Sequence, residues 1–150
     1  LCVVARQAWV NACESYPANP ASPHRLGGRA EAALENARLQ LAEWLRCSPL
    51  DLVWTSGATE ANNSLLHHCS LDTSGEGWVS AVEHPSVLEP ARKWFGARLK
   101  LIPVDSNGVV DLAWLSDQLK QKRPSLVAIM AANNETGVLQ PWRELCKLGV

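Results

Sequence analysis

The chain has 150 residues, of which 47% are hydrophobic, so it can form the core of about one domain. Its 14 Lys and Arg nearly balance its 15 Asp and Glu, and the formal net charge is −1. This balance gives no electrostatic reason to expect nucleic acid or an anionic membrane as a partner. No apolar run approaches the roughly 18 residues of a membrane-spanning helix.

The five cysteines are widely spaced and contain no CxxC pair. A disulfide framework or a zinc site would need paired spacing, so neither is predicted. Reduced thiols in a cytoplasmic protein are the simplest interpretation, because the chain shows no signal-peptide pattern. The seven tryptophans are scattered and are interpreted as packing residues.

Apolar spacing predicts two helices in the first third of the chain. One covers residues 2–15, and the longest covers 26–46, where Leu and Ala recur at three- and four-residue steps. A proline-broken loop at 19–24 separates them, and residues 52–55 are predicted to form a short strand.

Strands and helices alternate in the rest of the chain. Further strands are predicted at 78–82, 99–104 and 126–131. The last is wholly apolar and is expected to be buried on both faces. Helices are predicted at 87–95 and 112–119, the second capped by Asp111. The alternation predicts right-handed βαβ units and therefore an α/β fold with a mostly parallel sheet flanked by helices.

Polar clusters follow three of the predicted strands, where ligands bind in an open parallel sheet. The first is SGATEANN, in which the amides of Ala58 and Thr59 open a helix just after Gly57. This segment forms either an anion cradle or an ordinary capped turn. It lacks the Gly-Lys-Ser/Thr of a nucleotide P-loop, which argues against ATP.

The other two clusters hold a histidine and a pair of asparagines. His84 could stack on a planar ligand or shuttle protons, and its alternative role is structural. Asn133 and Asn134 could fix a ligand oxygen or merely cap the following turn.

Four motifs, TSGATEANN, AVEHPSVLEP, PVDSNGVVDL and AANNETGVLQP, resemble the cysteine desulfurases in order and spacing. These enzymes belong to the class V aminotransferase group of fold-type-I pyridoxal-phosphate enzymes. The earlier NPASPHRLGGRAEAALENAR fits the same family, so the resemblance runs from about Asn19 to Gln140. It implies that residues 1–150 are an incomplete cofactor-binding large domain, with residues 1–25 as N-terminal helix and loop and residues 26–150 as part of the α/β core.

The resemblance also implies roles for individual residues. Ala58 and Thr59 match the contacts to the phosphate of pyridoxal 5'-phosphate. His84 matches the histidine that stacks on the pyridine ring and helps proton transfer, which makes it the catalytic candidate. Asn134 matches the asparagine that bonds the phenolic oxygen of the cofactor. No metal ligands are implied.

Several family groups have no match in this chain. None of the five lysines stands in the Ser/Thr-x-His-Lys setting that forms the Schiff base, and none of the five cysteines matches the sulfur acceptor. The acidic partner of the pyridine nitrogen and the N-terminal Asn-Ala-Thr-Thr segment are also missing. We therefore expect a fragment that is inactive by itself.

The implied parent reaction removes sulfur from L-cysteine and gives alanine and an enzyme-bound persulfide. Family resemblance implies a homodimer and a sulfur-acceptor protein, with iron–sulfur cluster assembly or tRNA thiolation among the downstream pathways. The alternatives are a selenocysteine lyase, another class V enzyme, or a non-catalytic remnant of the fold.

Overall fold

The computed structural model describes residues 1–149, which divide into two compact units, Leu1–Trp54 and the part from Thr55 onward. The predicted boundary at residue 25 stays a prediction. None of the helices in the described part of the chain has the length and apolar character needed to cross a bilayer. The two units are described separately.

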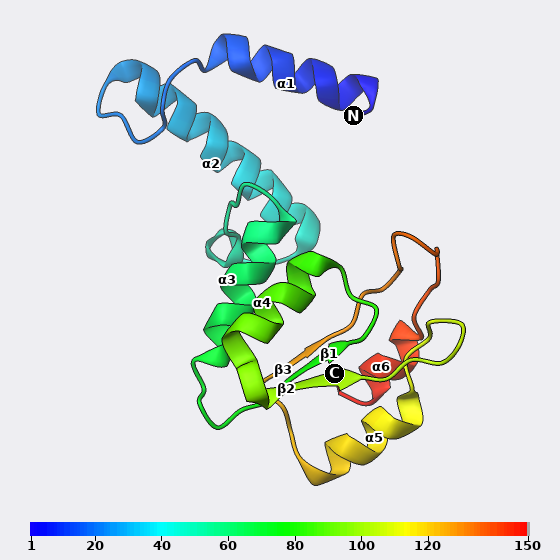
Figure 1. Cartoon of the computed structure of the whole chain (residues 1–150). Helices are drawn as coiled ribbons and strands as arrows, with labels where there is room; N and C mark the ends of the chain where they lie inside the picture. Colours follow the sequence, from blue (N-terminus) through cyan, green and yellow to red (C-terminus); the bar gives the residue numbers. More distant parts are fainter. Residues whose placement is uncertain (150) are drawn as a thin grey trace. The chain divides into compact units, whose positions relative to one another are not determined.

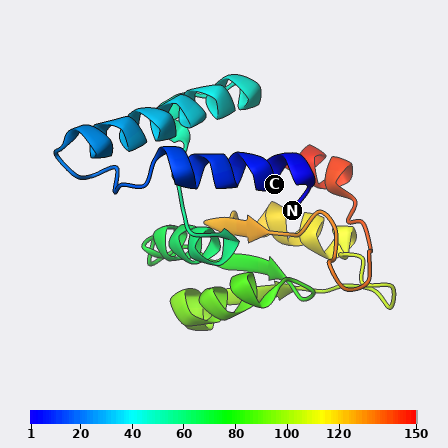
Figure 2. The same ribbon diagram turned by 90° about the horizontal axis from the view of Figure 1, so that it is seen from above.

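The first unit is a pair of helices, α1 (Val3–Ser15) and α2 (Arg25–Leu45), followed by the 3-10 turn η1 (Pro49–Asp51). Both helices confirm the predicted ranges, and Figure 2 shows them running in opposite directions on either side of their loop. The imidazole of His24 begins α2, because its Nδ1 accepts a hydrogen bond from the amide of Gly27 at 3.2 Å. α1 has no buried residue.

The second unit contains a three-stranded parallel sheet in the order β2–β1–β3. Its strands are β1 (Gly77–Ser80), β2 (Leu99–Ile102) and β3 (Leu126–Ala128). Its helices are α3 (Ala58–Ser70), α4 (Pro85–Phe95), α5 (Leu112–Gln121) and α6 (Trp142–Lys147), with a 3-10 turn η2 (Gly96–Arg98) before β2. The predicted α/β class with a parallel sheet flanked by helices is confirmed (Figure 1).

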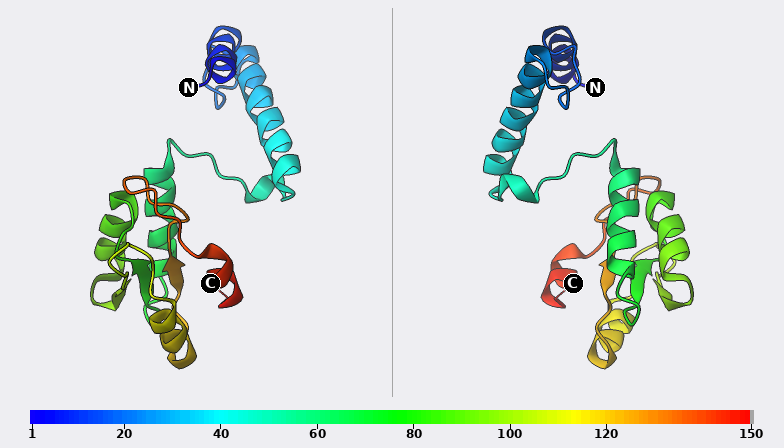
Figure 3. Two further views of the ribbon diagram at one scale, coloured as in Figure 1. Left: turned by 90° about the vertical axis from the view of Figure 1, so that its right-hand side faces the viewer. Right: turned by 90° about the vertical axis from the view of Figure 1, so that its left-hand side faces the viewer.

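Helices cover both faces of this sheet. Successive residues of β1 point to opposite sides, so neighbouring residues of this strand pack against different helices. Val79 packs in one cluster with Leu66 of α3 and with Ala91 and Phe95 of α4. Trp78 packs in the other, where the remaining buried residues are Ile102, Val110, Leu115 and Leu145. α3 and α4 therefore cover one face, and α5 and α6 the other (Figure 3).

Two predicted strands differ from the structure. Residues 52–55 are not a strand, because no other strand in the described part of the chain pairs with them; the carbonyl of Leu52 instead accepts a hydrogen bond from the Arg38 guanidinium. The strand predicted at 126–131 ends at Ala128 and is half-buried, since it lies at the edge of the three described strands. The fully buried strand is the central β1.

The interpretation of all tryptophans as packing residues was also wrong in part. Trp78 is fully buried, whereas Trp9, Trp44 and Trp142 are exposed.

A carboxylate at the start of β1 gives a prediction for the pH dependence of stability. Glu76 accepts hydrogen bonds from Trp78 Nε1 at 2.9 Å and Lys122 Nζ at 3.0 Å, and its other neighbour is Lys100 Nζ at 3.1 Å. These contacts, the Trp78 bond first, lower the pKa of Glu76 from 4.5 to about 2. A pKa depressed by folding stabilises the folded state above pH 4.5, and this stabilisation is lost as the pH falls through about 2.

We therefore expect Glu76→Gln to flatten the dependence of the unfolding free energy on pH between 4.5 and 2. Urea denaturation at a series of pH values measures this dependence. Glu43→Gln, at an exposed position, is the control and should leave the curve unchanged. A Glu76→Gln curve as steep as that of the wild type would contradict the prediction.

Candidate functional site

The N-terminus of α3 has free hydrogen-bond donors. The first helical bond runs from the amide of Ala61 to the carbonyl of Gly57, so the amides of Ala58, Thr59 and Glu60 precede the helical ladder. An added Cβ at Gly57 would meet nothing within 4 Å, and the space beside this turn is open. The positive end of a helix dipole with free amides is suited to an anion.

The carboxylate of Glu60, at this turn, is hydrogen-bonded to Ser56. Glu60 Oε2 accepts hydrogen bonds from the hydroxyl of Ser56 at 2.6 Å and from the amide of Ser56 at 2.8 Å. These bonds, the hydroxyl first, lower the pKa of Glu60. The carboxylate is therefore held on Ser56, outside the row of α3 amides.

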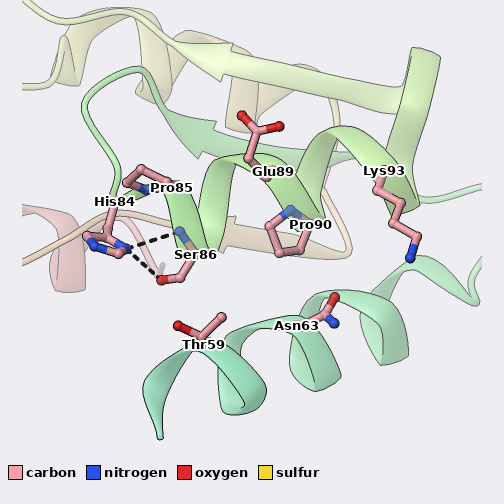
Figure 4. A pocket seen from close by; sticks show the side chains of 8 residues that line it. All are labelled: Thr59, Asn63, His84, Pro85, Ser86, Glu89, Pro90 and Lys93. Atoms are coloured by element: carbon pink, nitrogen blue, oxygen red, sulfur yellow. Dashed lines mark hydrogen bonds between the residues drawn. The ribbon is translucent and has the colours of Figure 1, made fainter.

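His84 occupies the start of α4, where it is the N-cap residue and Pro85 takes the first helical position. His84 is exposed, and its Nδ1 contacts Ser86. The side chain of Asn62, on α3, donates a hydrogen bond to the hydroxyl of Ser86. α3 and α4 are thereby joined at the ends that carry Thr59 and His84 (Figure 4).

Two neighbouring cavities bring these residues together. A cavity of about 530 Å³ is lined by Ser56, Gly57, Ala58, Thr59, Glu60, Asn62, His84 and Ser86. A second, of about 640 Å³, is lined by Thr59, Asn63, His84, Pro85, Ser86, Glu89, Pro90 and Lys93 (Figure 4). Thr59 and His84 line both, so the structure unites the first two polar clusters seen in the sequence.

The asparagine pair after β3 divides into two different environments. Asn133 Oδ1 accepts hydrogen bonds from the amides of Glu135 and Thr136, each at 2.9 Å, so Asn133 caps the turn. Asn133 Nδ2 also donates to the carbonyl of Val82 at 3.1 Å. Asn134 is exposed and takes no part in these bonds, and it lines neither of the two cavities.

Glu83, which precedes His84, supports the site from outside the two cavities, a role that the sequence reasoning did not assign. It is buried, and its Oε1 accepts hydrogen bonds from the hydroxyl of Ser80 at 2.9 Å and from the amide of Met130. Together with the Asn133–Val82 bond, it joins the loop that carries His84 to the loop that carries Asn134. A carboxylate directly after a predicted apolar strand was the available signal, because a buried carboxylate needs donors from a neighbouring segment.

The donors present fit two parts of pyridoxal phosphate. The α3 amides and the Thr59 hydroxyl suit its dianionic phosphate, and the exposed face of the His84 ring suits a planar heterocycle. Three of the five lysines have other contacts: Lys100 and Lys122 pair with Glu76, and Lys120 pairs with Asp117.

The remaining lysine near the site is also engaged. Lys93 lines the larger cavity, but its Nζ lies 4.2 Å from the centroid of the Trp94 ring. Among the described residues, no lysine has a contact with the α3 amides.

Comparisons with known proteins identify the family of the chain. The family model described as aminotransferase class-V matches residues 3–149. A protein of Archaeoglobus fulgidus named cysteine desulfurase IscS 1 is 36% identical over 135 residues, which are 87% of this chain and 35% of that protein. The mitochondrial cysteine desulfurase of Arabidopsis thaliana is 41% identical over 133 residues, which are 85% of this chain and 29% of that protein.

Solved structures show the same likeness. A NifS-like protein from Rickettsia africae superposes with a TM-score of 0.75 at 32% identity, over 95% of this chain and 40% of that one. A cysteine desulfurase from Thermococcus onnurineus superposes with a TM-score of 0.74 at 26% identity, over 95% and 38%. The chain thus spans about a third of the length of the two curated relatives.

Proposed function

The chain belongs to the class-V aminotransferase family, and we propose that it is part of a pyridoxal-phosphate-dependent cysteine desulfurase that converts L-cysteine to alanine and an enzyme-bound persulfide. The relatives named above support cysteine, rather than selenocysteine, as the substrate. The observation that carries the proposal is the cavity of about 530 Å³ that is lined by both the first residues of α3 and His84.

In this proposal each residue of the site has one task. The amides of Ala58 and Thr59, with the Thr59 hydroxyl, bind the phosphate at the positive end of α3. His84 covers one face of the pyridine ring, and Asn134 donates a hydrogen bond to the phenolic oxygen. When bound, pyridoxal phosphate supplies an electron sink that weakens bonds of the attached amino acid.

The proposal assigns the Schiff-base lysine and the acceptor cysteine to sequence outside these 150 residues, because no lysine or cysteine here has the family's setting. We also propose that the parent protein is a cytoplasmic homodimer that passes sulfur to an acceptor protein. We expect the chain alone to release no sulfide from L-cysteine. Sulfide release that disappears in Thr59→Ala would contradict this expectation.

The phosphate cradle is tested by Thr59→Ala, which removes one hydroxyl donor and leaves the α3 amides in place. A hydrogen bond to a charged group contributes about 1.5–3 kcal/mol, so the dissociation constant for pyridoxal phosphate should rise about 10–150-fold. Titration of the chain with the cofactor, followed by quenching of tryptophan fluorescence, measures this constant. Inorganic phosphate should compete with the cofactor for the wild-type chain.

Thr73→Ala is the matched control, because Thr73 is exposed and lies after the far end of α3. It should leave the affinity unchanged. If Thr59→Ala binds the cofactor as tightly as the wild type, or if phosphate does not compete, the cradle is assigned to the wrong residues.

A further inference from the structure

The hydrogen bonds around His84 determine which ring nitrogen carries its proton. The backbone N–H of Ser86 lies 3.0 Å from Nδ1 of His84. A backbone N–H can only donate, so Nδ1 must present a lone pair. A proton on Nδ1 would point at another proton and would remove the cap from α4.

The hydroxyl of Ser86 completes the same assignment. Ser86 Oγ lies 2.8 Å from Nδ1, and because Nδ1 is an acceptor, the hydroxyl proton points toward it. The lone pairs of Oγ are then left for another donor, which is Nδ2 of Asn62 at 3.0 Å. The three side chains form one directed row from Asn62 through Ser86 to His84 (Figure 4 shows the last two).

We propose that Asn62 and Ser86 are positioning residues that hold His84 as the neutral tautomer with its proton on Nε2. The ring therefore presents an N–H donor, not an acceptor, to the cavities that it lines. Uptake of a second proton would occur at Nδ1 and would break the α4 cap, so proton transfer through this ring is coupled to opening of the helix end. The use of the Nε2 donor toward the cofactor rests on the proposed function, whereas the tautomer does not.

The chain contains its own comparison for this arrangement. His24 also caps a helix through Nδ1, which accepts from the amide of Gly27 at 3.2 Å. Among residues 1–149, the only donor to this ring is the Gly27 amide, and no serine hydroxyl contacts it. A difference between the ring ¹⁵N signals of His24 and His84 therefore measures the effect of the Ser86 hydroxyl and of Asn62, which donates to that hydroxyl.

The test is nuclear magnetic resonance of the cofactor-free chain with ¹⁵N in the histidine rings. Two-bond ¹H–¹⁵N correlations distinguish a protonated from an unprotonated ring nitrogen. The neutral ring of His84 should give the pattern of an Nε2–H tautomer alone. Ser86→Ala, which removes one of two donors, and Asn62→Asp, whose carboxylate takes the hydroxyl proton, should each shift the Nδ1 resonance toward the protonated position.

Ser86→Thr retains a hydroxyl and should restore the wild-type pattern, and Ser106→Ala, at an exposed turn, is the control. The signals of His24 should stay unchanged in every variant. An Nδ1–H ring in the wild type, or a wild-type pattern in both Ser86→Ala and Asn62→Asp, would overturn the proposal. If Asn62→Asp does not fold, Asn62→Ala replaces it. Because no cofactor is added, a failure of cofactor binding is a separate result.

Discussion

Replacement of Trp78 by alanine is expected to lower the free energy of unfolding of the second unit by about 3–5 kcal/mol, the usual cost of removing a buried large aromatic side chain. Trp78 is fully buried in the cluster between the sheet and α5. Its ring meets that of Trp114 edge-on at 6.1 Å, and its Nε1 donates to Glu76. The substitution therefore leaves a cavity and also removes the first cause of the low pKa of Glu76.

Urea denaturation followed by far-ultraviolet circular dichroism measures this loss without using tryptophan fluorescence. Trp44→Ala is the matched control, because the side chain of Trp44 is 78% exposed in α2. It should change the unfolding free energy by no more than about 0.5 kcal/mol. Equal effects of the two substitutions would show that Trp78 does not lie at the centre of a packed core.

The regular elements were predictable where burial leaves a pattern in the sequence, either a helical period of apolar residues or a short apolar run. The helical spacing at 26–46 and the apolar runs at 78–82 and 99–104 each correspond to an observed helix or strand. Asp111 caps α5 as predicted, with its Oδ1 2.9 Å from the amide of Trp114, because a cap depends only on residues three positions apart. The strand predicted at 52–55 was wrong, because a strand also needs a partner that its own residues do not specify.

The sequence was sufficient to predict the candidate site residues, but not the hydrogen bonds that hold them in place. Family motifs indicated Ala58, Thr59, His84 and Asn134, and the structure brings the first three to one cavity. The contacts that fix them join residues far apart in the chain: Asn62 to Ser86 over 24 positions, and Asn133 to Val82 over 51. Spacing in the sequence carries no information about such pairs. The neighbouring asparagines also have the same residue type, and only the turn geometry separates the cap, Asn133, from the exposed Asn134.

Glu83 is where stability and the candidate site are most closely connected, and its removal gives the second large prediction. Glu83→Ala leaves the hydroxyl of Ser80 and the amide of Met130 without their acceptor. A buried donor without a partner costs about 1–3 kcal/mol, which applies to the buried hydroxyl of Ser80, whereas the half-buried amide of Met130 should add less. The loop before α4 also loses one of its two connections to the loop after β3, so His84 and Asn134 should no longer be held in register.

Three measurements separate these effects. Urea denaturation gives the loss of stability, hydrogen exchange gives the protection of the Met130 amide, and titration with pyridoxal phosphate gives the affinity. Glu83→Gln keeps an oxygen acceptor and should restore most of all three, whereas Glu83→Ala should lose them together. If Glu83→Ala loses stability but binds the cofactor like the wild type, Glu83 supports only the core. If Glu83→Gln behaves like Glu83→Ala, the negative charge, rather than the shared acceptor, joins the two loops.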